Sequence, residues 1–202
     1  LIFDEVTSGF RETLGAMYKT TKIIPDMVTF GKAISNGIPM SALLGKSNIM
    51  KSFYNTFISS TYWGDRTGPA AAIATIDFMK KNNVNYHVKQ TGLKLREILE
   101  KAARKSNLDI VISGTPSLIS YRLNVPDWPL SLTFIISRML EKGILSNDRI
   151  YANFSHSKKD IKKFEHALNE TFYDLNRKID KGNLGQAISY GVKKMGFNKV
   201  YK

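Results

Sequence analysis

The sequence of 202 residues contains no cysteine, and its acidic residues are few. The absence of cysteine excludes a disulfide framework and a thiolate metal site, and it fits a reducing compartment such as the cytoplasm. No apolar run approaches the roughly 20 residues that a membrane-spanning helix needs. The opening LIFDEVTSGF has no basic region before an apolar run, as a signal peptide would. We therefore expect a soluble, cytoplasmic protein with no membrane partner.

The shortage of acidic residues leaves a formal net charge of +13, from thirty Lys and Arg against seventeen Asp and Glu. Residues 158–202 alone hold eleven basic and five acidic residues. Such a charge raises the question of an anionic partner. However, the sequence has no nucleic-acid-binding motif and no interleaving of aromatic and basic residues, so we do not expect nucleic acid to bind. His87, His156 and His166 lack metal-ligand spacing, and we expect no metal site.

The hydrophobic content, 43%, is sufficient for one sizeable core or two small ones. The chain opens on Leu1-Ile2-Phe3, an apolar run that ends at Asp4-Glu5, and this pattern predicts a buried parallel strand over 1–6 whose carboxyl end opens onto a site. Parallel strands have neighbours on both sides. We therefore expect the chain to be the C-terminal part of a longer protein. The alternative is a processing boundary that happens to fall at a strand.

The remaining elements are predicted from the spacing of apolar residues and from glycine and proline residues, which mark turns. In the first part we expect a turn or short helix over 12–18, a strand over 26–30, a hairpin partner or following strand over 40–45, a short helix over 47–53 and a buried helix over 70–79. In the second part we expect a helix over 84–108, paired strands over 109–113 and 118–124, a helix over 129–143, and a helix that starts with a capping box at Ser157–Asp160. The second part reads as a compact α+β unit.

Two predicted strands end at residues that can perform chemistry. Asp4 ends the first strand, and Lys32 follows the strand over 26–30. The carboxyl ends of parallel strands line the site in α/β folds, so a carboxylate and a lysine can meet there over one ligand. Pyridoxal phosphate (PLP) needs a lysine amine for a Schiff base and an acid that keeps its ring nitrogen protonated. Taken singly, each residue is more often an ordinary cap or a surface lysine.

Three strings in order, LIFDEVTSGFR, PDMVTFGKAISNGIPMSALLGK and SSTYWGDRTGPAAAIAT, resemble the class III PLP-dependent aminotransferases, most closely the glutamate-1-semialdehyde aminomutase branch. The resemblance implies an α/β fold of fold-type I. It further implies that residues 1–79 form the C-terminal part of the PLP-binding large domain with its parallel sheet, that 80–180 form a small C-terminal α+β domain, and that 181–202 form a basic tail. It also implies a homodimer with shared active sites.

The same resemblance implies the roles of four residues. Lys32 corresponds to the catalytic Schiff-base lysine, Asp4 to the partner of the pyridine nitrogen, and Val6 to the residue that packs on the ring. Thr61 corresponds to the threonine that reaches the cofactor phosphate of the neighbouring subunit. Glu5 also matches the motif, as does Arg11, and for each we expect a structural ion pair.

The implied function is that of an aminotransferase or aminomutase, which moves an amino group between a small-molecule amino donor and a carbonyl acceptor. The family's glycine-rich phosphate loop lies upstream of the aspartate strand and is not found here. We therefore expect the N-terminal half to be missing, and the 202-residue chain alone to bind PLP weakly or not at all. The alternative from another class is a catalytically inactive family member that acts as a basic binding protein.

Overall fold

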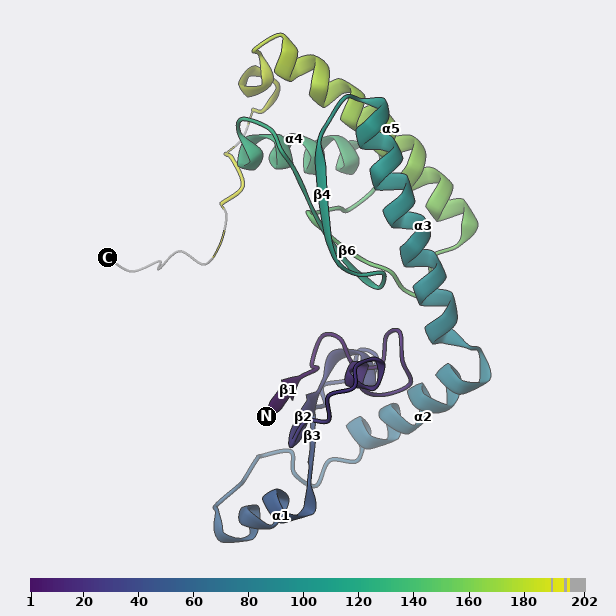
Figure 1. Cartoon of the computed structure of the whole chain (residues 1–202), viewed down its shortest axis with the longest axis vertical. Coiled ribbons are helices and arrows are strands. Elements are labelled where there is room, and N and C mark those ends of the chain that lie inside the picture. The colour runs from purple at the N-terminus through teal and green to yellow at the C-terminus, as the bar shows by residue number, and fades with distance from the viewer. Residues whose placement is uncertain (190, 195, 197–202) are drawn as a thin grey trace, which may run out of the picture. The chain divides into compact units, whose positions relative to one another are not determined.

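The computed structural model describes residues 1–189, 191–194 and 196 (Figure 1). The chain divides into two compact units, Leu1–Lys89 and Gln90–Lys202. The division falls within helix α3 (Val84–Lys105). Positions 190, 195 and 197–202, which belong to the predicted basic tail, lie outside the described residues.

Unit 1 is built on a three-stranded sheet in the order β1 (Ile2–Asp4), β2 (Met27–Phe30) and β3 (Ala42–Gly45). As predicted, β1 and β2 are parallel, with Asp4 opposite Thr29. β3 runs antiparallel to β2, which settles the two alternatives for residues 40–45 in favour of the hairpin partner. The sheet is therefore mixed, with its one parallel pair at the predicted site.

The prediction that the first strand is buried is wrong for the chain as described. Leu1 is 60% exposed and Ile2 is 62% exposed. The reason is that β1 is an edge strand: β2 pairs with one side of it, and no strand among the described residues pairs with the other. An apolar run predicts the preference of a strand for burial, whereas burial itself requires a second surface.

The helical segments of unit 1 that precede residue 67 are all short. The stretch predicted over 12–18 forms only a 3-10 turn, η1 (Met17–Thr20), because Gly15 adopts a left-handed φ of +108° and interrupts it. A second 3-10 turn, η2 (Lys32–Ile34), follows β2. The short helix predicted over 47–53 is present as α1 (Ser47–Met50), continued by the 3-10 turn η3 (Lys51–Asn55).

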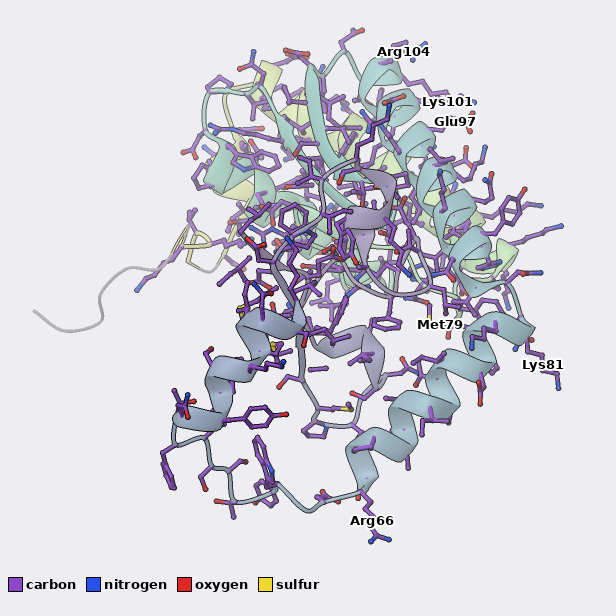
Figure 2. The ribbon with its side chains drawn as sticks, turned by 60° about the horizontal axis from the view of Figure 1, so that its bottom comes forward. Arg66, Met79, Lys81, Glu97, Lys101 and Arg104 are labelled. Atoms are coloured by element: carbon purple, nitrogen blue, oxygen red, sulfur yellow. The ribbon has the colours of Figure 1, made fainter. Side chains whose placement is uncertain are left out.

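Helix α2 (Thr67–Lys81) was predicted to be buried, and this second prediction of burial is also wrong. Gly68, Ala72 and Met79 are its buried residues, whereas Ile73 and Phe78 are more than half exposed. Figure 2 shows α2 with Arg66 before its first turn and Met79 and Lys81 in its last. The helix is apolar on several sides, but only one of these faces packs against the core of unit 1, so the remaining apolar side chains stay exposed. That core consists of Ala16, Val28, Phe30, Ile34 and Ala72.

Unit 2 is an α+β unit, as predicted, with an antiparallel sheet in the order β4 (Ile110–Thr115), β5 (Leu118–Leu123) and β6 (Arg149–Tyr151). Helices α3, α4 (Trp128–Glu141) and α5 (Lys158–Asp180) lie around this sheet, and the 3-10 turn η4 (Leu184–Ala187) follows α5 (Figure 1). The capping box predicted at Ser157–Asp160 is present. The core contains Leu99, Leu132 and Phe172, all fully buried. Within the described part of the chain, no helix has the length and apolar character required to cross a membrane.

Candidate active site at the ends of β1 and β2

The candidate site lies where two parallel strands end side by side. The register pairs Asp4, the last residue of β1, with Thr29 of β2. Lys32 comes two residues after β2 ends, at the start of η2. The parallel pairing therefore brings the predicted carboxylate and the predicted lysine to the same edge of the sheet.

The carboxylate of Asp4 is exposed and only partly engaged. Its Oδ1 accepts hydrogen bonds from the backbone N–H of Val6, at 3.0 Å, and from the Thr29 hydroxyl, at 3.4 Å. No described residue donates to Oδ2. Asp4 also lines a groove of about 330 Å³ beside β1. The two bonds to Oδ1 fix the orientation of the carboxylate, while Oδ2 can accept a hydrogen bond from a donor group of a ligand.

Lys32 has an unusual backbone conformation. Its φ is +47°, in the left-handed region that residues other than glycine rarely adopt. The exposed side chain reaches across the strand ends, and its Nζ donates a hydrogen bond to the hydroxyl of Thr7 at 2.6 Å. Within the described ranges, no carboxylate forms an ion pair with Lys32. The amine is thus held near β1 by a neutral partner.

Val6 follows the end of β1, donates its backbone N–H to Asp4 and packs closely on the turn after β2. A Cβ atom placed on Gly31 would stand 3.2 Å from Cγ1 of Val6, so the absence of a side chain at position 31 permits this approach. A larger residue at position 31 would press on Val6. The Val6 side chain therefore lies against Gly31, the residue that precedes Lys32.

Glu5, the neighbour of Asp4, has a different environment. It is 3% exposed, and its carboxylate accepts the backbone N–H groups of Met17 and Tyr18, the latter at 2.8 Å. These two N–H groups open the 3-10 turn η1 and have no partner within it. The ion pair expected for Glu5 is therefore replaced by hydrogen bonds to the backbone, and the role of this residue is structural.

Thr61 is not brought to this site by the contacts of the chain. It lies in an exposed turn, within a stretch from 54 to 67 in which every residue is exposed. No described residue bonds to its hydroxyl. Downstream, Asp65 accepts the backbone N–H of Thr67 at 2.9 Å and its hydroxyl at 2.7 Å, and these bonds lower the pKa of Asp65 and fix the start of α2.

The sequence did not single out two hydroxyls that contact the predicted residues. Thr7 bonds to Lys32, and Thr29 bonds to Asp4. A signal was available for both, because each threonine stands at or just after the end of a strand that was predicted to open onto the site. What the sequence could not supply was the direction of the Lys32 side chain, which depends on its left-handed backbone.

The fold is that of PLP-dependent transaminases. The structure matches an internal aldimine form, with PLP, of the FumI protein of Sphingopyxis sp. MTA144, at a TM-score of 0.82 and 22% identity over 89% of this chain and 44% of that one. It also matches an S-selective transaminase from Bacillus megaterium, at a TM-score of 0.75 and 25% identity, over 93% of this chain and 44% of that one.

Comparison of sequences identifies the family to which the chain belongs. The family model of the class-III aminotransferases matches residues 1–169, and the chain belongs to this family. It is 38% identical over 117 residues to a 3-aminobutyryl-CoA aminotransferase of Cloacimonas acidaminovorans, covering 57% of this chain and 28% of that protein. It is 29% identical over 180 residues to a glutamate-1-semialdehyde 2,1-aminomutase of Methanosarcina acetivorans, covering 81% of this chain and 42% of that protein. The chain thus spans less than half the length of these relatives.

Proposed function

We propose that this chain forms the lysine-bearing part of a PLP-dependent aminotransferase or aminomutase. The observation that carries the proposal is that Asp4 and Lys32 come from the adjacent ends of two parallel strands, with Val6 packed against Gly31, the residue before Lys32. Membership in the class-III family and the fold of PLP-bound transaminases support it.

The residues at the strand ends fit PLP as a donor set. Oδ2 of Asp4 can accept the proton of a pyridinium nitrogen, and the Val6 methyl groups can cover one face of a ring. When bound, PLP supplies an aldehyde that condenses with a lysine amine with loss of water, and a ring that takes up an electron pair from the substrate. Lys32 supplies that amine and carries the proton to and from the substrate carbon.

The proposed assembly is a homodimer with shared active sites. In this arrangement the Thr61 hydroxyl, which has no partner among the described residues, binds the cofactor phosphate of the neighbouring subunit. The exposure of the whole stretch from 54 to 67 supports this role. The substrates are a small-molecule amino donor and a carbonyl acceptor. Transfer between molecules and exchange within one molecule use the same lysine and carboxylate, and the substrate walls decide between them.

The substitution Lys32→Ala in the full-length protein tests the proposal. We expect the visible absorption band of lysine-bound PLP to disappear and turnover to fall by a factor of about 10³ or more, because no other described lysine closely follows the carboxyl end of β1 or β2. Lys22→Ala, which removes an exposed lysine of the same unit, is the matched control and is expected to keep both. An unchanged band in Lys32→Ala would show that another lysine carries the cofactor.

A further inference from the structure

We infer that Thr7 is a positioning residue that holds the amine of Lys32 toward the end of β1. The inference rests on the proposed function of Lys32. A hydrogen bond of 2.6 Å between Nζ of Lys32 and Oγ1 of Thr7 joins two residues 25 positions apart in the sequence. A lysine side chain has four rotatable bonds, and a single strong hydrogen bond removes much of that freedom.

The hydroxyl of Thr7 is itself held in place by the turn on which it lies. The Thr7 carbonyl accepts a hydrogen bond from Nε of Arg11 at 2.5 Å. The N–H of Gly9 donates to the Glu5 carbonyl at 2.9 Å, which closes the turn around Thr7. The buried Glu5 carboxylate fastens the start of the same turn to η1. These hydrogen bonds therefore fix the backbone of the turn from which the Thr7 hydroxyl projects.

The backbone of Lys32 is constrained from the other side. Its carbonyl accepts the N–H of Asn36 at 3.2 Å, and the preceding Gly31 is packed close to Val6. The left-handed φ of +47° is a conformation that a residue with a Cβ adopts at an energetic cost. This conformation directs the side chain back over the strand ends, where Thr7 stands.

A hydroxyl suits this position better than a carboxylate. It accepts a hydrogen bond from a protonated amine and can donate one to a neutral amine, so it holds both forms. A carboxylate would instead bind the ammonium in an ion pair and oppose its conversion to the nucleophile. The described residues provide no such carboxylate to Lys32. Thr7 thus fixes the position of the amine without fixing its charge.

The experiment uses the full-length protein freed of cofactor. On mixing with PLP, the rate at which the absorption band of lysine-bound PLP appears is measured for wild type, Thr7→Val and Thr7→Ser. We expect about a tenfold slower rate in Thr7→Val, which has the same shape without the hydroxyl, and a rate within about twofold of wild type in Thr7→Ser. Thr20→Val, which removes an exposed hydroxyl bonded to the Met17 carbonyl in the same unit, is expected to keep the wild-type rate.

The outcomes separate this inference from the function on which it rests. A wild-type rate in Thr7→Val, with a band that Lys32→Ala abolishes, would overturn the role of Thr7 and leave Lys32 in place. Equal slowing in Thr7→Val and Thr7→Ser would also overturn it, because the hydroxyl would then not be the active element. The absence of a band in the wild type would overturn both. Thermal unfolding of each variant checks that the fold is intact, and Thr7→Ala replaces Thr7→Val if the latter does not fold.

Discussion

Acidic side chains in this chain meet three different environments, although they share one chemistry. Asp4 is exposed, and only its Oδ1 accepts hydrogen bonds from described residues, whereas the adjacent Glu5 is buried and accepts hydrogen bonds from two backbone N–H groups. Glu97 and Lys101 lie one turn apart on α3 (Figure 2), and Lys101 is bonded to Oε1 of Glu97. Nζ of Lys94 lies 3.0 Å from Oε2 of the same carboxylate. The neighbours of each carboxylate, and not its type, decide its role.

We expect the lysines around Glu97 to make the stability of the protein depend on pH. The hydrogen bond from Lys101, followed by that from Lys94, lowers the pKa of Glu97 from 4.5 to about 2. Because the folded-state pKa is lowered, the stabilisation is complete above pH 4.5 and is lost as the pH falls toward 2. We expect Glu97→Gln to lower Tm by about 1–2 °C at pH 7, and by less at pH 3. Circular dichroism melts at the two pH values measure this.

The matched control for Glu97 is Glu165→Gln, since Glu165 has no ion pair within the described ranges. This variant is expected to shift Tm equally little at both pH values. The same loss of Tm in Glu97→Gln at pH 7 and pH 3 would contradict the assignment of the lowered pKa to the lysine pairs.

Helix α3 depends on one small residue for its packing. A Cβ on Gly92 would stand 1.8 Å from the carbonyl oxygen of Pro116 and 2.3 Å from its carbon, both backbone atoms that cannot rotate away. Gly92 is buried within α3. The turn between β4 and β5 therefore approaches the helix at a point where no other residue fits.

We predict that Gly92→Ala destabilises the protein by about 3 kcal/mol, because the helix and the turn must separate. Helix propensity alone predicts the opposite sign, a gain of about 1 kcal/mol. Urea denaturation measures the difference. Gly185→Ala, where a Cβ meets nothing within 4 Å, is the control and is expected to change the free energy of unfolding little. A Gly92→Ala protein as stable as wild type would contradict the close contact.

Elements with strong local signals were predictable from the sequence. The apolar stripe of α3, the capping box at Ser157 and the strand pair around Gly114 each depend on residues close in the chain, and the structure confirms them. The parallel pairing of β1 and β2, which brings Asp4 near Lys32, was also predicted. In contrast, strand β6 was not predicted, because a strand of three residues is too short to show an alternation of apolar and polar residues.

The errors concern burial and side-chain direction. β1 and α2 have the composition of buried elements, yet Ile2 and Ile73 are exposed, because burial depends on a covering surface that lies outside the local pattern. The contact of Lys32 with Thr7 could likewise not be predicted from the sequence. It depends on a left-handed lysine, which no propensity predicts.

At the scale of the whole chain, the proposed site residues do not all lie together. Asp4, Val6 and Lys32 gather at one sheet edge, while Thr61 stands apart on an exposed stretch. The chain spans 28% and 42% of two curated relatives. The proposed function accounts for this separation by a dimer in which the exposed stretch of one subunit meets the strand ends of the other.

The most direct test is the visible spectrum of the full-length protein with PLP, recorded before and after addition of an amino donor such as glutamate. We predict an absorption band of lysine-bound PLP that converts to the band of the amine form of the cofactor when the donor is added, because the proposed function assigns the Schiff-base amine to Lys32 and the partner of the ring nitrogen to Asp4. A folded full-length protein that shows no band with PLP would contradict the assignment of Lys32 and with it the proposed function.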